Sequence, residues 1–290
     1  MLSDYHMHFE YGEYDEEWVK LFFNQAKNKN LKEIGITEHS HAFIEFKDLY
    51  YDELILDNSE IGEFQKKWLN NKKSKFVHSL DEYANFIKTL KEKGYPVKFG
   101  IEICNFRNQD KVREIINKYD FDYVIVSIHF INGWGFDFSL LKDEFNKRDL
   151  IDIWKDYVSE IEKVANSGLY DILGHPFNLR MFKNIPNAKS VDYLLEKAAI
   201  ALSKNNMLID VNTGTYYRYP IKEISPYSDF MKYVKKYNIP VILSSDAHQP
   251  EHVGMYIEEA SEYVKDFGID KYVVFNKRKR KLMDIWESEN

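Results

Sequence analysis

Seven short apolar segments recur along the chain, and each one ends in polar or ionisable residues. They are rich in β-branched and aromatic residues, which favour β-strands. The pattern therefore predicts strands that each present polar side chains at one end. The segments are residues 2–8, 34–39, 97–102, 123–129, 171–175, 207–212 and 240–248.

Apolar residues at helical spacing lie between most of these segments, for example at 151–165, 191–202 and 230–237. Some of these stretches end at Gly or Asn, as helices often do. Regular alternation of strand and helix implies parallel strands joined by crossovers. The sequence therefore predicts an α/β sheet or barrel.

The chain has 290 residues, an ordinary length for one α/β barrel. We expect a single domain over 1–290, because no linker, repeat or low-complexity tract marks a boundary. The connection at about 41–95 breaks the rhythm, being long, aromatic and charged, with a helix-like stretch at 79–93. Long insertions tend to be lids or binding walls, so we interpret this one as a loop elaboration of the same domain.

Composition narrows the class of protein. No apolar run approaches the roughly 20 residues that span a bilayer, and the formal charge of −7 disfavours nucleic acid as a partner. We expect the basic run at 277–281 to be solvated surface. The first residues do not resemble a signal peptide and Cys104 is the single cysteine, so we expect a soluble, cytoplasmic protein without disulfides.

Histidines and carboxylates gather at the ends of the predicted strands. Residues two apart on a strand share a face, so His6 and His8 point the same way, as do Asp246 and His248. The loops at the carboxyl ends of parallel barrel strands open on one face, so groups far apart in sequence converge there. The eight candidate metal ligands are His6, His8, His39, Glu102, His129, His175, Asp246 and His248.

A structural role for any one of these residues is plausible, but a cluster of imidazoles with two acids serves no packing purpose. Imidazole with carboxylate and without thiolate suits Zn, Mn or Fe(II), and eight ligands exceed the three or four that one catalytic ion uses. We therefore predict two to three divalent ions. Closely spaced ions activate water and neutralise phosphate oxygens, which are the requirements of phosphate-ester hydrolysis.

Six short motifs resemble the PHP (polymerase and histidinol phosphatase) family, in particular its histidinol-phosphate phosphatase branch. They span nearly the whole chain and occur in the order typical of the family. The resemblance implies a distorted (β/α)7 TIM-like barrel with a trinuclear metal site at the carboxyl ends of the strands. The motifs are His-Met-His at 6–8, Thr-Glu-His at 37–39, Gly-Ile-Glu at 100–102, Ser-Ile-His-Phe at 127–130, Leu-Gly-His-Pro at 173–176 and Ser-Asp-Ala-His-Gln-Pro-Glu-His-Val-Gly at 245–254.

The resemblance also implies how the ligands divide among the ions. One ion would take His6, His8, Glu102 and Asp246, and Glu102 would bridge to a second ion held by His129 and His175. The third ion would take His39 and His248. A further histidine expected about six residues beyond His8 is absent, and Asp15 is the expected substitute, with Glu13 and Glu10 behind it.

Two arginines are candidates for substrate binding. The guanidinium fork bonds two phosphate oxygens at once. Arg180 follows His175 on the loop after one strand, and Arg218 follows the strand that ends at Asn212. Both positions are similar to the family's phosphate-binding positions.

The resemblance implies a phosphatase that converts L-histidinol phosphate and water to L-histidinol and phosphate in histidine biosynthesis. The leaving group would take its proton from an ion-bound water or from an acid such as Asp15, and residues Tyr50, Tyr51 and Asp52 are expected to form a wall around the substrate. One alternative is another PHP phosphoesterase, such as a tyrosine phosphatase, a nucleotide phosphatase or a nuclease. A second alternative is a metal-binding protein without catalysis.

Overall fold

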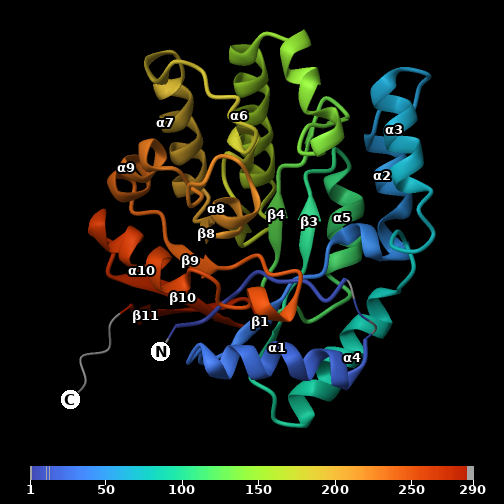
Figure 1. The fold of residues 1–290 in the computed structure, drawn as a ribbon, viewed down its shortest axis with the longest axis vertical. Coiled ribbons are helices and arrows are strands. Elements are labelled where there is room, and N and C mark those ends of the chain that lie inside the picture. The colour runs from blue at the N-terminus through green and yellow to red at the C-terminus, as the bar shows by residue number, and fades with distance from the viewer. Residues whose placement is uncertain (1, 11, 13, 286–290) are drawn as a thin grey trace.

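The computed structural model describes residues 2–10, 12 and 14–285. Its strands are parallel in the main sheet and alternate with helices along the chain, so the predicted α/β class is confirmed (Figure 1). Within the described residues, no helix combines the length and apolar character needed to cross a membrane.

The main sheet has five parallel strands in the order β3-β4-β7-β8-β9. Strands β1 and β2 form a second parallel pair. Consecutive strands are neighbours in the main sheet, as expected when each crossover is a single helix or loop. The strands are β1 (Ile34–Ile36), β2 (Val97–Phe99), β3 (Glu102–Cys104), β4 (Ile125–Ser127), β5 (Phe130–Ile131), β6 (Trp134–Gly135), β7 (Ile172–Leu173), β8 (Leu208–Asn212), β9 (Val241–Ser244), β10 (Lys271–Asn276) and β11 (Lys279–Asp284).

The N-terminal segment 2–8 runs between β1 and β9. On one side Gly35 donates a backbone hydrogen bond to Asp4, and on the other side His8 donates one to Ala247. A single bridge between His39 and Glu102 continues from β1 to β3. Backbone contacts therefore link the outer strand β9 to β3 by way of segment 2–8 and β1.

The helices cover the outside of the strands, with α6 and α7 side by side (Figure 1). The predicted helices at 151–165, 191–202 and 230–237 are confirmed as α6, α7 and α9. Asp149 precedes helix α6 as its N-cap, and its side chain accepts hydrogen bonds from two backbone N–H groups. Gly168 follows the helix as its C-cap, with φ 65°. The helices are α1 (Glu16–Asn28), α2 (Lys47–Glu53), α3 (Glu60–Leu69), α4 (Leu80–Glu92), α5 (Gln109–Ile116), α6 (Leu150–Ser167), α7 (Ala188–Lys204), α8 (Gly214–Arg218), α9 (Ser228–Lys236) and α10 (Ile257–Asp266), with 3-10 helices at Ser40–Ala42, Ile44–Phe46, Ser139–Lys147, Asn178–Arg180 and Pro250–His252.

The connection 41–95 is more helical than a loop elaboration, since it carries α2, α3 and α4. The expected helix at 79–93 is α4, which starts with a capping box between Ser79 and Glu82. The apolar residues of these helices join the main hydrophobic core. Each of these helices buries one apolar stripe in the core, and this burial explains why the segment packs against the sheet.

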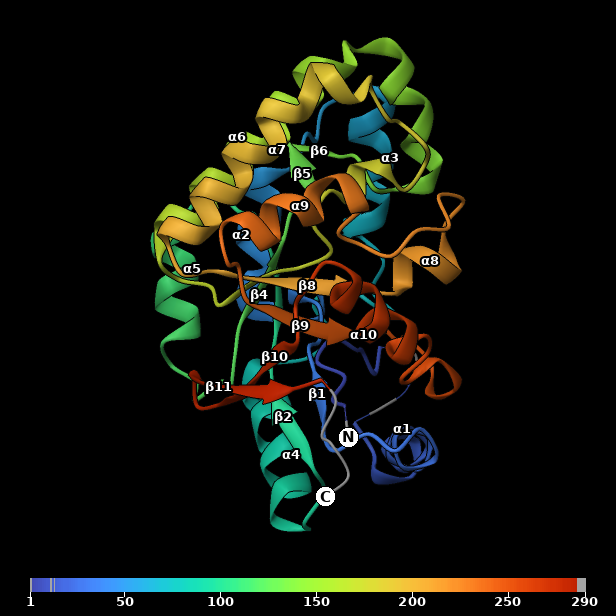
Figure 2. The same ribbon diagram turned by 90° about the vertical axis from the view of Figure 1, so that its left-hand side faces the viewer.

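The hairpin of β10 and β11 packs near the amino ends of the sheet strands (Figure 2). Phe275 joins a small buried cluster with Tyr5 and Tyr123, separate from the main core. The basic run 277–281 spans the hairpin turn, and Arg278 pairs with Asp171 at 2.6 Å. Part of the basic run therefore fastens the hairpin to the strands.

Asp4 ties three parts of the chain together and is fully buried. Its carboxylate accepts hydrogen bonds from Ser245 N at 2.9 Å, from Ser245 Oγ at 2.5 Å and from Gly254 N at 2.9 Å. Burial raises the pKa of Asp4 from 3.8 to about 6, although the hydrogen bonds from Ser245 and Gly254 oppose the rise.

We predict that Asp4→Asn destabilises the metal-free protein by roughly 1–3 kcal/mol, because an amide nitrogen would face backbone donors. Between about pH 4 and pH 6 native Asp4 keeps a proton that the unfolded chain releases, so its contribution to stability is full below that window and falls as pH rises. Urea unfolding should therefore show a wild-type advantage over Asp4→Asn that shrinks across the window. A pH-independent advantage would contradict the prediction, and the exposed Asp120→Asn is the control.

Candidate metal centre

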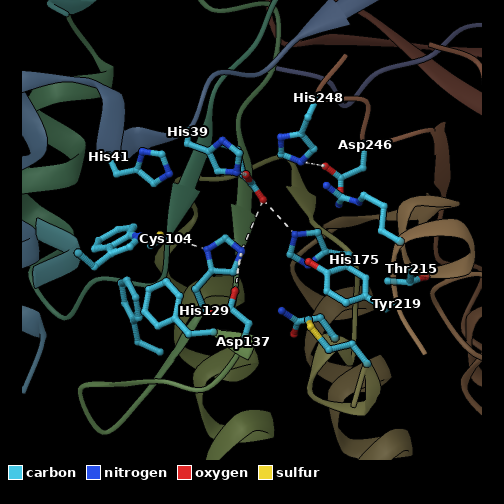
Figure 3. Close-up of a pocket in the computed structure, with 17 residues that line it drawn as sticks. His39, His41, Cys104, His129, Asp137, His175, Thr215, Tyr219, Asp246 and His248 are labelled. Carbon is cyan, nitrogen blue, oxygen red and sulfur yellow. Dashed lines mark hydrogen bonds and ion pairs between the residues drawn. The ribbon is translucent and has the colours of Figure 1, made fainter. Parts of the chain in front are cut away.

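All eight predicted ligands converge at the carboxyl ends of the strands. Their side chains come from segment 2–8 and from the ends of β1, β4, β7 and β9, with Glu102 opening β3. Figure 3 shows the rings of His39, His129 and His175 arranged around one point, with Asp246 and His248 alongside. The strand-end pattern in the sequence thus predicted a real spatial cluster.

Glu102 is the centre of this cluster and is 2% exposed. Ser127 Oγ donates a 2.5 Å hydrogen bond to its Oε1 atom. Gly174 leaves room for that hydroxyl, because a Cβ there would lie 2.2 Å from Ser127 Oγ. Five imidazole Nε2 atoms face the Glu102 carboxylate, at 3.0 Å for His175, 3.1 Å for His39, 3.4 Å for His6, 3.8 Å for His129 and 3.9 Å for His8.

Asp246 is the second carboxylate of the cluster. Its Oδ1 atom lies 3.4 Å from His8 Nε2 and 3.3 Å from His248 Nε2. Its Oδ2 atom pairs with Arg218. Glu102 and Asp246 together therefore contact every predicted imidazole ligand.

Burial and the neighbouring charges set the protonation of the site. Burial would raise the pKa of Glu102, but the charges of His6 and His39 outweigh it and hold the pKa well below its ordinary range. Burial lowers the pKa of His129 to about 3. Glu102 is therefore ionised and His129 neutral, which are the forms that bind metal ions. Burial would lower the pKa of His6, but the charges of Glu102 and Asp246 outweigh it and raise this pKa, so the His6 ring must release a proton when a metal ion binds.

Two ligands have a backbone conformation that L-residues rarely adopt. His175 has φ 26° and Asp246 has φ 54°. Such conformations cost free energy and persist where surrounding contacts fix them, often at functional sites. Here the turn of the chain directs both side chains into the cluster instead of along the strand.

The buried polar atoms of the cluster fit divalent ions. Among the described residues, His6 Nε2, His8 Nε2 and Glu102 Oε2 are buried without a hydrogen-bond partner, which is costly unless a ligand satisfies them. Four triplets of the described residues bring their ligand atoms within 4.8 Å of one another, which suits coordination by imidazole and carboxylate. Three of the four consist of predicted ligands only. They are His6, His8 and Asp246; His6, Glu102 and His175; and His8, His39 and His248.

The structure places Asp15 away from the cluster. Asp15 is exposed and caps α1, with its Oδ1 atom accepting a 2.9 Å hydrogen bond from Trp18 N. Glu13 lies outside the described residues. Glu10 instead reaches the cluster, where its Oε1 atom lies 2.5 Å from His248 Nδ1. Asp15 is the N-cap residue of α1, so its carboxylate faces the helix and not the cluster. Its spacing from His8 did not reveal this role.

Sequence reasoning missed other groups around the ligands. Asp210 Oδ2 lies 2.8 Å from His6 Nδ1, and Cys104 Sγ lies 3.1 Å from His129 Nδ1. Asp210 lies two residues before Asn212 on the buried strand β8, so both side chains lie on the same face of the strand. This spacing could have identified Asp210 from the sequence. Cys104 alternates with Glu102 in the same way on β3.

A cavity of about 300 Å³ opens over the cluster. Its lining includes His41 and Trp68 from segment 41–95, together with Phe138 and Asp137. Asp137 lies beside the cluster, with its Oδ2 atom 3.7 Å from His129 Nε2. Trp68 and Phe138 pack with ring centroids 5.2 Å apart. Burial raises the pKa of Asp137 to about 7.

The expected wall of Tyr50, Tyr51 and Asp52 is wrong in its residues. Tyr50 is buried, and its hydroxyl lies 3.1 Å from Cys104 Sγ. Tyr51 and Asp52 are exposed on α2 and are absent from the cavity lining. Helix α2 presents Tyr50 inward, and the helical repeat turns its two neighbours outward.

The two predicted arginines have different surroundings. Arg218 lines the cavity and pairs with Asp246. Arg180 is buried, donates a 2.7 Å hydrogen bond to Asp229 and stacks 4.1 Å over the ring of Tyr227. Arg180 is absent from the cavity lining, so the structure brings Arg218 to the site and gives Arg180 other partners.

A family model described as the PHP domain matches residues 4–214. The chain belongs to the PHP domain family. The match includes six of the eight predicted ligands, and the strand-end turn with Asp246 and His248 follows it. The resemblance stated from the motifs is therefore confirmed.

Two relatives of the family are similar in sequence. The chain is 30% identical to the probable histidinol-phosphatase of Deinococcus radiodurans over 207 residues, which covers 70% of this chain and 78% of that protein. It is 23% identical to the histidinol-phosphatase of Lactococcus lactis over 283 residues, which covers 94% of each chain.

A solved structure shows the same fold. The histidinol phosphate phosphatase of Lactococcus lactis, complexed with zinc, L-histidinol and phosphate, aligns with a TM-score of 0.71 at 20% identity. The alignment covers 97% of this chain and 98% of that chain. This likeness supports the α/β architecture of the family.

We predict that Glu102→Gln removes most of the bound divalent metal, because the central carboxylate loses its charge. Metal content after gel filtration, measured by plasma emission spectrometry, is the test. Glu53→Gln is a matched control, since Glu53 is also a buried glutamate but lies outside the cluster. Full metal occupancy in Glu102→Gln would refute the central role of this carboxylate.

Proposed function

We propose that the chain is a metal-dependent phosphomonoester hydrolase that converts L-histidinol phosphate and water to L-histidinol and phosphate. The observation that carries the proposal is the buried cluster in which Glu102 faces five imidazoles beneath an open cavity. The names of the relatives support the substrate, since they are histidinol-phosphatases. The reaction also agrees with a small phosphorylated substrate as the main partner.

The eight predicted ligands would hold two to three divalent ions, with Zn, Mn or Fe suited to their donor set. The three overlapping triplets support a trinuclear site. Ions bound there supply charge that activates water and neutralises phosphate oxygens. We infer that Glu10, not Asp15, acts near the third ion.

We further propose that the seven strand segments close into a (β/α)7 barrel within a single domain of residues 1–290. Support comes from segment 2–8, whose backbone bonds both to β1 and to the β9 end. A closed barrel would explain why the first and last ligands meet. A place in amino-acid biosynthesis fits the predicted cytoplasmic localisation.

The residues of the cavity have distinct roles in this proposal. Arg218 grips the phosphoryl oxygens with its guanidinium fork after exchanging its bond to Asp246. Trp68 and Phe138 offer flat faces to the imidazole of the substrate. Asp137 lines the cavity beside His129, at 3.7 Å between Oδ2 and Nε2, so its carboxyl group is placed to pass a proton to the leaving oxygen.

Another PHP phosphoesterase is the second candidate function, because the cluster alone does not select the leaving group. The cavity favours a small substrate, since about 300 Å³ suits one aromatic ring and a phosphate. The net charge of −7 disfavours a nuclease. A metal-binding protein without catalysis would have little use for Arg218 beside an open cavity.

We predict that the Zn- or Mn-loaded protein has a kcat/KM for L-histidinol phosphate roughly 10- to 100-fold above that for p-nitrophenyl phosphate, because the aromatic wall fits the imidazole. Phosphate release from a panel that includes a phosphotyrosine peptide and a nucleoside monophosphate is the measurement. Equal efficiency on all esters would reject L-histidinol phosphate as the preferred substrate but would still support phosphatase activity. No hydrolysis of any ester would reject the phosphatase as well.

We predict that Arg218→Ala raises KM for the phosphate ester about 10- to 100-fold, since charge-assisted hydrogen bonds contribute roughly 1.5–3 kcal/mol. Metal content should stay at the wild-type level, because Arg218 contacts Asp246 from outside the cluster. Kinetics and metal analysis of the same preparation test both parts. Loss of metal would reject the clamp role, and Arg113→Ala on α5 controls for the loss of a positive charge.

A further inference from the structure

Glu10 lies beside two imidazoles that belong to different parts of the chain. Its Oε1 atom is 2.5 Å from His248 Nδ1, and its Oε2 atom is 3.4 Å from His39 Nδ1. The side chain is 21% exposed, so the carboxylate stands at the edge of the buried cluster. The carboxylate of Glu10 therefore contacts the ring of His39, which follows β1, and the ring of His248, which follows β9.

The two rings turn their other nitrogens inward. His39 Nε2 lies 3.1 Å from Glu102, and His248 Nε2 lies 3.3 Å from Asp246. An ionised carboxylate only accepts hydrogen bonds, so His248 Nδ1 carries the hydrogen of its bond to Glu10. His39 Nδ1 is buried without a hydrogen-bond partner, and the Glu10 carboxylate at 3.4 Å is the acceptor that a hydrogen on this nitrogen would face. The inward nitrogens are then left with the lone pairs that coordinate metal ions.

Asp210 stands in the same relation to His6, at 2.8 Å from its Nδ1 atom. A carboxylate behind a metal-bound imidazole fixes its tautomer and orientation and strengthens the ligand.

We propose that Glu10 is a positioning residue for the third ion, which orients His39 and His248 together from outside the coordination sphere. The inference rests on the proposed metal centre and deepens it. The histidine expected about six residues beyond His8 is absent from the sequence. The inference assigns this part of the predicted site a carboxylate in the outer shell instead of that ligand. A single substitution at Glu10 should therefore affect both rings at once.

The rival arrangement makes Glu10 a direct ligand. Its carboxylate, His39 and His41 offer atoms within 4.8 Å of one another. That arrangement would use His39 Nδ1, while His39 Nε2 faces Glu102. It also places an ion near Lys75, whose Nζ atom lies 3.3 Å from His41 Nε2, and the lysine charge opposes a cation there.

The test measures metal binding without substrate, using the full chain with Zn and, separately, Mn. Stoichiometry at saturating metal comes from plasma emission spectrometry, and the affinity of each ion comes from competition with a chromogenic chelator. The variants are Glu10→Gln and Glu10→Asp. The control is Glu17→Gln, an exposed glutamate on α1.

We expect Glu10→Gln to keep the wild-type stoichiometry at saturating metal while its weakest ion binds about 10- to 100-fold less tightly. The tighter ions should keep their affinities, which a general loss of stability would not allow. Glu10→Asp retains the charge, so its loss should be smaller. Glu17→Gln should match the wild type.

Two results would overturn the inference. One ion fewer at saturating metal would make Glu10 a ligand, and wild-type affinity for every ion would leave Glu10 without a role. Failure of the proposed function would look different, because a fully metal-loaded wild type would then release no phosphate from L-histidinol phosphate.

Discussion

The site depends on the contact between one buried carboxylate and five imidazoles. Glu102 is almost fully buried, and its ionised form is stabilised by His6, His39 and the other rings that surround it. The five rings arrive from four parts of the chain, segment 2–8 and the ends of β1, β4 and β7, so the strands must hold a common register for the contact to form. The rare backbone conformations of His175 and Asp246 belong to the same constraint, because the chain bends there to keep its ligands on the shared centre.

Strand-end chemistry could be predicted because it follows local rules. Alternation on a strand placed His6 with His8 and Asp246 with His248, and parallel topology brought all eight ligands together. The helices at 151–165 and 191–202 were equally readable from their apolar spacing. The acid expected near the proposed third ion was not readable in this way, because Asp15 is the N-cap residue of α1. Which acid in 10–15 reaches the cluster depends on the path of a loop, and sequence spacing does not fix that path.

The substrate cavity shows the limit of sequence reasoning more clearly. Segment 41–95 was expected to form a wall, and it does contribute Trp68 and His41. The aromatic pair Tyr50 and Tyr51 looked equally suitable, but helical geometry buries one and exposes the other. Asp137 comes from outside any predicted strand, beyond the short hairpin of β5 and β6. Arg180 and Arg218 follow similar strands, and tertiary partners alone separate them, since Asp229 holds Arg180 in place.

The position of segment 2–8 has a consequence for the order of events during synthesis. Its histidines leave the ribosome first, yet their neighbours Asp246 and His248 are made about 240 residues later, the separation in sequence between His6 and Asp246. A nascent chain therefore cannot complete the centre until β9 and its following turn have emerged. Until then the early histidines and Glu102 lack two of the eight predicted ligands, Asp246 and His248. Completion of the predicted metal centre is thus a late step in the synthesis of this chain, because it requires residues on both sides of the sheet sequence.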